Sequence, residues 1–166
     1  MKALLYEIFC KLDAYIEAEN NERRKTGSLQ IAKSEAIVLG QMSLLANEKV
    51  AAVLALSQTA DLDALLTMDS FAIGCLRKIL QERGLIYDED SNKIWIPEGA
   101  TFEPLFDLKN IKVKTIDAES ALVSKAIKAP KKNKTLIRQA IALKQFPKLV
   151  DRIVKNGGDL KFFAKT

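Results

Sequence analysis

Residues 35–46 have the sequence Glu-Ala-Ile-Val-Leu-Gly-Gln-Met-Ser-Leu-Leu-Ala, in which a short apolar run ends at Gly40. An apolar run of this length bounded by a glycine is typical of a buried strand. We therefore expect a strand at residues 35–39 and a short helix at residues 41–46. A glycine at this junction lets a phosphate group approach the backbone, and the helix start offers free N–H groups.

The segments on either side predict a mixed α/β protein, a β-sheet with helices packed against it. Further strands are expected at residues 62–66, 85–87, 93–96, 102–108 and 111–116, and helices at residues 2–19, 70–83, 118–129, 134–145 and 147–156. The strands at 85–87 and 93–96 flank a polar run, which predicts a hairpin. Residues 20–28 are polar and predict a loop, and residues 50–56 fit either a helix or a strand.

The chain of 166 residues is long enough for one domain with its own core. We expect an N-terminal helix and loop at 1–30, an α/β core at 31–116, and basic C-terminal helices at 117–166 packed on the core. Residues 1–108 carry 11 Lys and Arg against 17 Asp and Glu, a net charge of −6, whereas residues 109–166 carry 15 against 4, a net charge of +11. This asymmetry indicates either a polyanionic partner or a solvated, lysine-rich helical face.

The chain contains no histidine. This excludes a Ser-His-Asp triad, a Cys-His pair, imidazole acid–base catalysis and metal sites that use histidine. The two cysteines, Cys10 and Cys75, are too few for a zinc site built from cysteine alone, and we expect both in the core of a protein from a reducing compartment. No apolar run reaches the roughly 18 residues of a membrane span. Since Glu7 and Asp13 are atypical of a secretory signal, we expect a cytoplasmic protein that does not contact a membrane.

A pair of carboxylates opens the expected strand at 62–66. Asp61 and Asp63 lie two residues apart, so their side chains should leave the strand in the same direction. Two converging carboxylates suit Mg²⁺, which takes few protein ligands and completes its shell with phosphate and water oxygens. Glu103 or Asp107, on a later strand, could supply a third acid. A solvated turn is the alternative interpretation of the Asp-x-Asp sequence.

Three segments follow one another in a characteristic order: Leu39-Gly40-Gln41, then Thr59-Ala60-Asp61-Leu62-Asp63, then a helical segment that contains Ser124-Lys125-Ala126. This order resembles the nucleotidyltransferase superfamily of the DNA polymerase beta type. It is most similar to the minimal bacterial members, which include nucleotidyltransferase-like proteins of toxin–antitoxin and abortive-infection systems. The resemblance covers roughly residues 34–145 and rests on these short motifs.

The resemblance implies a nucleotidyltransferase-like mixed sheet flanked by helices, with a short C-terminal helical segment. It implies that Asp61 and Asp63 hold Mg²⁺ or Mn²⁺ under a nucleoside triphosphate, with Glu103 or Asp107 as the third catalytic acid. Lys125 would be a point charge for the phosphates, and Gly40 and Ser43 would cradle the triphosphate. The implied activity is metal-dependent nucleotidyl transfer to RNA, a protein or a small molecule, in a protein that could work with a toxin–antitoxin partner.

A second hypothesis is a catalytically degenerate module of the same fold. Gln41 stands where the family has a second Gly or a Ser, and Ser57 stands where its minimal members have Arg. Such a module would bind a partner protein, a nucleotide or nucleic acid through the basic C-terminal helices. Lys131, Lys132 and Lys134 would then contact a nucleic-acid backbone, and a solvated loop is the alternative interpretation of these lysines.

Overall fold

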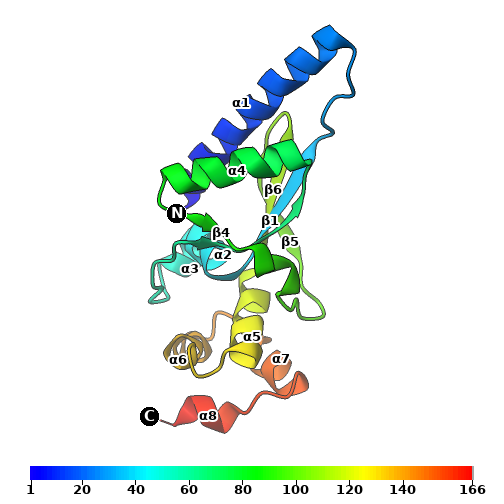
Figure 1. The fold of residues 1–166 in the computed structure, drawn as a ribbon. Helices are drawn as coiled ribbons and strands as arrows, with labels where there is room; N and C mark the ends of the chain where they lie inside the picture. Colours follow the sequence, from blue (N-terminus) through cyan, green and yellow to red (C-terminus); the bar gives the residue numbers. More distant parts are fainter. Residues whose placement is uncertain (166) are drawn as a thin grey trace.

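In a computed structural model, which describes residues 1–165, four strands form the main sheet in the order β3-β1-β6-β5 (Figure 1). The central strand β1 (Ser34–Val38) runs parallel to β6 (Ile111–Ile116) and antiparallel to β3 (Ala64–Thr67). The edge strand β5 (Phe102–Asp107) is antiparallel to β6. The predicted mixed α/β class, a mixed sheet flanked by helices, is confirmed.

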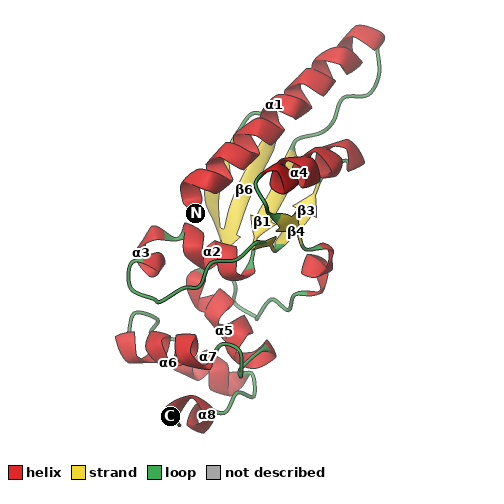
Figure 2. Ribbon diagram, turned by 60° about the vertical axis from the view of Figure 1, so that its left-hand side comes forward, coloured by secondary structure: helices red, strands yellow, loops and turns green. Residues whose placement is uncertain are grey.

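Two helices cover one face of this sheet, as Figure 2 shows. They are α1 (Lys2–Thr26) and α4 (Ser70–Glu82). Their buried apolar residues form one core cluster with alternate residues of β1 and β6, a cluster that includes Leu5, Phe9, Leu12, Ala36, Val38, Leu76, Ile111 and Val113. Burial of this much apolar surface is the main favourable contribution to folding. Neither helix could span a membrane, and the same is true of every other helix within residues 1–165.

The first helix is longer than the sequence pattern predicts. We expected a loop from residue 20, but α1 continues to Thr26 and ends at Gly27, which has a φ of 70°. The reason is Asn20, whose buried side chain accepts a hydrogen bond from the Ile31 N–H (2.7 Å) and donates one to the Ile31 carbonyl (3.2 Å). The chain after the helix is thereby folded back against the last two turns of α1.

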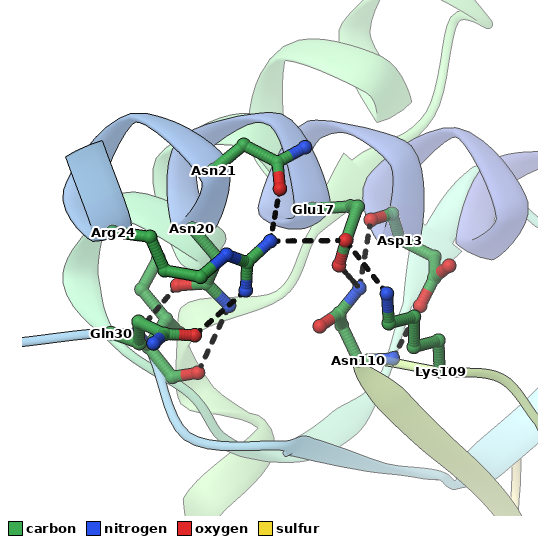
Figure 3. A network of polar contacts seen from close by, with 9 residues as sticks. Asp13, Glu17, Asn20, Asn21, Arg24, Gln30, Lys109 and Asn110 are labelled. Carbon is green, nitrogen blue, oxygen red and sulfur yellow. Dashed lines mark hydrogen bonds and ion pairs between the residues drawn. The ribbon is translucent and has the colours of Figure 1, made fainter.

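A polar network fastens the middle of α1 to the start of β6 (Figure 3). Asp13 accepts a hydrogen bond from the Asn110 N–H (2.6 Å), and Glu17 accepts from Lys109 Nζ (2.7 Å) and Asn110 Nδ2 (3.0 Å). Hydrogen bonds from Lys109 and Asn110 lower the pKa of Glu17 to about 2. Arg24, about two turns further along α1, also lies 3.3 Å from the Glu17 carboxylate. The network braces the part of α1 that extends beyond the sheet.

The C-terminal helices form a second layer at the end of the molecule opposite the tip of α1 (Figure 1). They are α5 (Ala118–Lys128), α6 (Lys134–Leu143), α7 (Leu149–Lys155) and α8 (Leu160–Ala164). They share a second apolar cluster with residues of α2 (Gly40–Ala46) and with Leu39 and Ile116. The first three agree with the predicted helices to within about two residues at each end. The fourth was not predicted, and it begins where Asp159 accepts a hydrogen bond from the Lys161 N–H.

The predicted hairpin is wrong. Strand β4 (Ile86–Tyr87) pairs in parallel with β2 (Asp61–Leu62), and Glu89–Lys93 forms the 3₁₀ helix η1 in place of a turn. Asp88 starts η1 by accepting a hydrogen bond from the Asp90 N–H (2.9 Å), which favours a helical turn over a hairpin. The ambiguous stretch around residue 50 contains the short helix α3 (Glu48–Ala51).

Candidate functional site

The expected strand at 62–66 is interrupted at Asp63, and this interruption builds the site. Leu62 and Ala64 on either side are fully buried, while Asp63 is half-buried. The Asp63 carbonyl accepts a hydrogen bond from the Leu39 N–H (2.8 Å), which places this residue at the end of β1 beside Gly40. The structure therefore brings together the glycine and the second aspartate that the sequence singled out.

Gly40 and Asp63 are in such close contact that a side chain at position 40 would force the Asp63 carboxylate to move. Gly40 has a φ of 59°, and a Cβ atom added to it would collide with Oδ2 of Asp63. Both the left-handed conformation and the lack of space favour glycine. Ser43, which was expected to face the triphosphate, is buried and donates its hydroxyl to the Gly40 carbonyl (2.7 Å). Ser43 therefore supports the turn.

Asp88 is the third carboxylate of the site, and sequence analysis missed it. Its N–H donates to the Leu62 carbonyl (3.0 Å), which holds the residue alongside the start of β3. Its side chain lies close enough to that of Asp63 to raise the pKa of the Asp63 carboxyl group. The only signal in the sequence is that Asp88 directly follows the apolar run 85–87. This signal assigns Asp88 to the site only if β4 pairs with β2, and the sequence does not predict that pairing.

The neighbouring carboxylates perturb Asp63. Burial, the contact with the Asp88 side chain and the charges of Asp88 and Asp61 together raise the pKa of Asp63 to about 6, against the opposing effect of Lys125. Two carboxyl groups can share a hydrogen bond only when one of them holds the proton. Asp61 is exposed, and its N–H donates to Thr59 Oγ1 (3.2 Å). The aspartates thus form an acidic group with Asp63 at its centre.

Lys125 lies across the Gly40 turn from this acidic group. It lines a cavity of about 40 Å³ with Leu39, Gly40 and Trp95, at the point where α5 packs on the start of α2. Burial lowers the pKa of Lys125, and the charge of Lys132 lowers it further, while Asp63 raises it. The half-buried lysine therefore lies within electrostatic reach of both Asp63 and Lys132.

The two acids on β5 are not brought to this site. In the register of the sheet, Glu103 on β5 lies opposite Thr115 on β6. Thr115 in turn lies opposite Val38 on β1, and Val38 lies opposite Ala64 on β3. Three strand spacings of about 4.8 Å therefore place the Glu103 backbone about 14 Å from the residue that follows Asp63. Asp107 lies at the other end of β5 and forms an ion pair with Lys33 (2.6 Å).

The basic residues of the turn between α5 and α6 divide into two kinds. Lys131 and Lys132 are exposed. Lys134 is half-buried, and its Nζ lies 4.9 Å from the centre of the Phe162 ring, so its charge interacts with an aromatic face of α8. Of the three lysines expected to contact nucleic acid, two are therefore exposed in the turn near Lys125.

A hydrogen bond holds the loop before Asp61 in place. Gln41, at the start of α2, donates from Nε2 to the Ser57 carbonyl (2.8 Å). The two residues that depart from the family pattern thus contact each other, and they close one side of the site.

No protein-family model matches the chain, and no curated protein or solved structure matches it. The chemistry of the site therefore has to be inferred from its own residues. Within residues 1–165, no group of three or more carboxylate or cysteine side chains is arranged to hold a metal ion on its own. Two carboxylates and an adjacent lysine suit a divalent cation that is already bound to a phosphate group. The phosphate oxygens would then complete the coordination shell of the cation.

Proposed function

We propose that the chain is a nucleotidyltransferase-like protein that binds a nucleoside triphosphate together with Mg²⁺ or Mn²⁺. The observation that carries this proposal is the neighbouring carboxylates of Asp63 and Asp88 at the Gly40 turn, with Lys125 beside Gly40 and close enough to affect the pKa of Asp63. Carboxylates forced together without a counter-ion keep a proton between them, and a divalent cation can replace that proton. A site with cation ligands on one wall and a lysine on the other suits a metal-bound phosphate.

Each side chain has a defined part in this binding. Asp63 and Asp88 would hold the cation, and exposed Asp61 would add negative charge at its outer side. Lys125 would bind a phosphate oxygen as a point charge, with Lys132 close enough to contribute. The bound cation neutralises phosphate charge and polarises the phosphoryl group for nucleotidyl transfer. An RNA or a protein is the proposed acceptor.

The proposal is tested with labelled nucleotides. The full-length protein is incubated with each α-labelled nucleoside triphosphate, Mg²⁺ or Mn²⁺, and RNA or protein acceptors, and bound and transferred label are measured. We expect label binding to fall at least about tenfold, or about 1.4 kcal/mol, in Asp63→Asn, Asp88→Asn and Lys125→Gln. Asp90→Asn is the matched control, since Asp90 is exposed and paired with Lys93 (2.8 Å). Equal label on all these variants and the wild type would contradict the proposal.

A non-catalytic module of the same fold is the second candidate. The observation that favours it is that neither Glu103 nor Asp107 lies beside Asp63, so the carboxylates for a two-metal reaction are not assembled. Such a protein would bind a nucleic acid through Lys131 and Lys132, with an affinity that falls steeply with salt. Binding lost in Lys131→Gln with Lys132→Gln, yet kept in Asp63→Asn, would support this candidate.

A further inference from the structure

A large hollow lies among the C-terminal helices, apart from the site at Asp63. It has a volume of about 810 Å³ and is lined by residues of α6, α7 and α8. Its walls are mostly apolar, with Ile141, Ala142, Val150, Leu160 and Phe163 among the lining side chains. These helices lie at the end of the molecule opposite the tip of α1 (Figure 1).

Helix α6 presents a regular stripe to the groove. Thr135, Arg138, Gln139 and Ala142 line it at spacings of three and four residues, which is one face of a helix. The stripe extends along most of α6, a ten-residue helix about 15 Å long. A helical face that borders an apolar hollow is the usual receiving surface for a second amphipathic helix. The groove would fit about three turns of such a helix.

Most of the charges around the groove are positive. Arg138 is the only charged residue that lines it, and Lys161 and Lys165 flank the lining residues Leu160 and Ala164 on α8. None of these three cations forms an ion pair with a carboxylate within residues 1–165. An apolar partner with acidic residues at its edges would complement this surface, whereas a basic partner would be repelled.

The acidic residues of this region do not neutralise the groove. Asp117 accepts hydrogen bonds from the N–H groups of Thr101 and Ser120, and Glu119 is paired with Arg152 (3.1 Å). Asp159 caps α8 by accepting from the Lys161 N–H (2.9 Å). None of these three carboxylates lines the groove. Asp151, next to the lining residue Val150 on α7, is exposed and adds a negative charge beside the groove. The three cations Arg138, Lys161 and Lys165 outnumber Asp151 and Asp159, so the surface stays positive.

We propose that this groove binds an acidic amphipathic helix from a partner protein. The apolar face of that helix would cover the α6 stripe and Phe163, and its acidic residues would pair with Arg138, Lys161 and Lys165. Burial of apolar surface would supply most of the affinity, and the charges would select acidic helices over others. This binding is independent of the proposed nucleotide site.

The test is a selection for helical peptides followed by affinity measurements. A displayed library of peptides of about 16 residues is selected on the full-length wild-type protein, and the enriched peptides are synthesised and measured by fluorescence anisotropy. We expect them to be acidic, with apolar residues three and four positions apart. Their Kd should rise at least about tenfold in Ala142→Trp, which fills the groove, and in Arg138→Glu.

Controls separate the groove from general effects. Ala142 is exposed, so its replacement leaves the core intact. Ala18→Trp places the same substitution at an exposed position of α1 and should leave the Kd within about twofold of the wild type. The proposal is overturned if enriched peptides bind Ala142→Trp as tightly as the wild type, or if the selection yields basic or purely apolar peptides. It is also overturned if polyglutamate or an oligonucleotide displaces the peptides as well as the unlabelled peptide does.

Discussion

Gly40 and Asp63 are the residue pair on which the site depends. Gly40 adopts a φ of 59°, and its missing side chain leaves the space that the Asp63 carboxylate occupies. Substitution of Gly40 therefore has two costs, one from the backbone conformation and one from the contact. The chain offers a way to separate them, because Gly84 has a similar φ of 68° and open space where its Cβ would lie.

We predict that Gly40→Ala destabilises the protein more than Gly84→Ala does. The left-handed backbone alone should cost about 1 kcal/mol in each variant, and the clash with Asp63 should add about 1–2 kcal/mol at Gly40 only. Urea unfolding measures both changes, and Asp63→Ala in the Gly40→Ala background should recover part of the difference. Equal losses in the two glycine variants would show that the contact with Asp63 does not matter.

The raised pKa of Asp63 has a defined effect on stability. A folded-state pKa of about 6, above the ordinary value near 4, means that the folded protein binds the proton more tightly than the unfolded chain. The stability linked to this proton is fully present below about pH 4 and is lost as the pH rises through about 6. Since Asp63 is only half-buried, solvent screening reduces the effect to about 1 kcal/mol.

We therefore predict that Asp63→Asn, which mimics the neutral acid, is more stable than the wild type at pH 7.5 by about 1 kcal/mol and equally stable at about pH 3.5. Urea unfolding in the presence of a chelator measures both values. Asp90→Asn serves as the control and should show no such change with pH. A difference between Asp63→Asn and the wild type that is the same at both pH values would contradict a raised pKa in the folded state.

At the scale of elements, α6 and the loop after α3 hold each other in place. Gln139 of α6 accepts a hydrogen bond from the Ala55 N–H (2.8 Å) and donates one to the Val53 carbonyl (3.2 Å). The same loop continues to Ser57, which contacts Gln41 beside the site. One side chain thus connects the C-terminal helices to the segment that leads into Asp61.

We predict that Gln139→Leu lowers the free energy of unfolding by about 1–2 kcal/mol, because two backbone groups lose their partner. Limited proteolysis should then cut faster within residues 52–60. The comparison variant is Gln145→Leu, since Gln145 is exposed and lies beyond the end of α6. Unchanged stability and cleavage in Gln139→Leu would mean that the loop is held by other contacts.

Elements whose signals are local could be predicted from the sequence. Strands β5 and β6 and helix α5 agree with their patterns. The hairpin prediction was wrong because β4 pairs with β2, which lies more than 20 residues earlier, and such pairing leaves no trace in a short window.

The same limit explains what could be predicted of the site. Gly40, Asp63 and Lys125 are marked by their own segments, and they lie together. Asp88 and the exclusion of Glu103 depend on which strands are neighbours, and strand order follows from packing of the whole sheet. The extension of α1 depends likewise on the distant contact between Asn20 and Ile31.

At the scale of the whole molecule, the site lies where two apolar clusters meet. Val38 belongs to the cluster under α1 and α4, and the next residue, Leu39, belongs to the cluster under the C-terminal helices. The chain crosses from one cluster to the other at the Gly40 turn. The acidic part of the chain brings Asp63 to this boundary and the basic part brings Lys125, so the uneven charge distribution places opposite charges within electrostatic reach of each other.

The most direct test is the dependence of nucleotide affinity on Mg²⁺. Calorimetric titration of the full-length protein with ATP, with Mg²⁺ and with a chelator, gives the factor by which the cation strengthens binding. We predict a factor of at least about ten for the wild type and for Asp90→Asn, and a factor near one for Asp63→Asn and for Asp88→Asn. An affinity that does not change with Mg²⁺, or a Mg²⁺ effect that survives in Asp63→Asn, would contradict a metal–nucleotide site at the Gly40 turn.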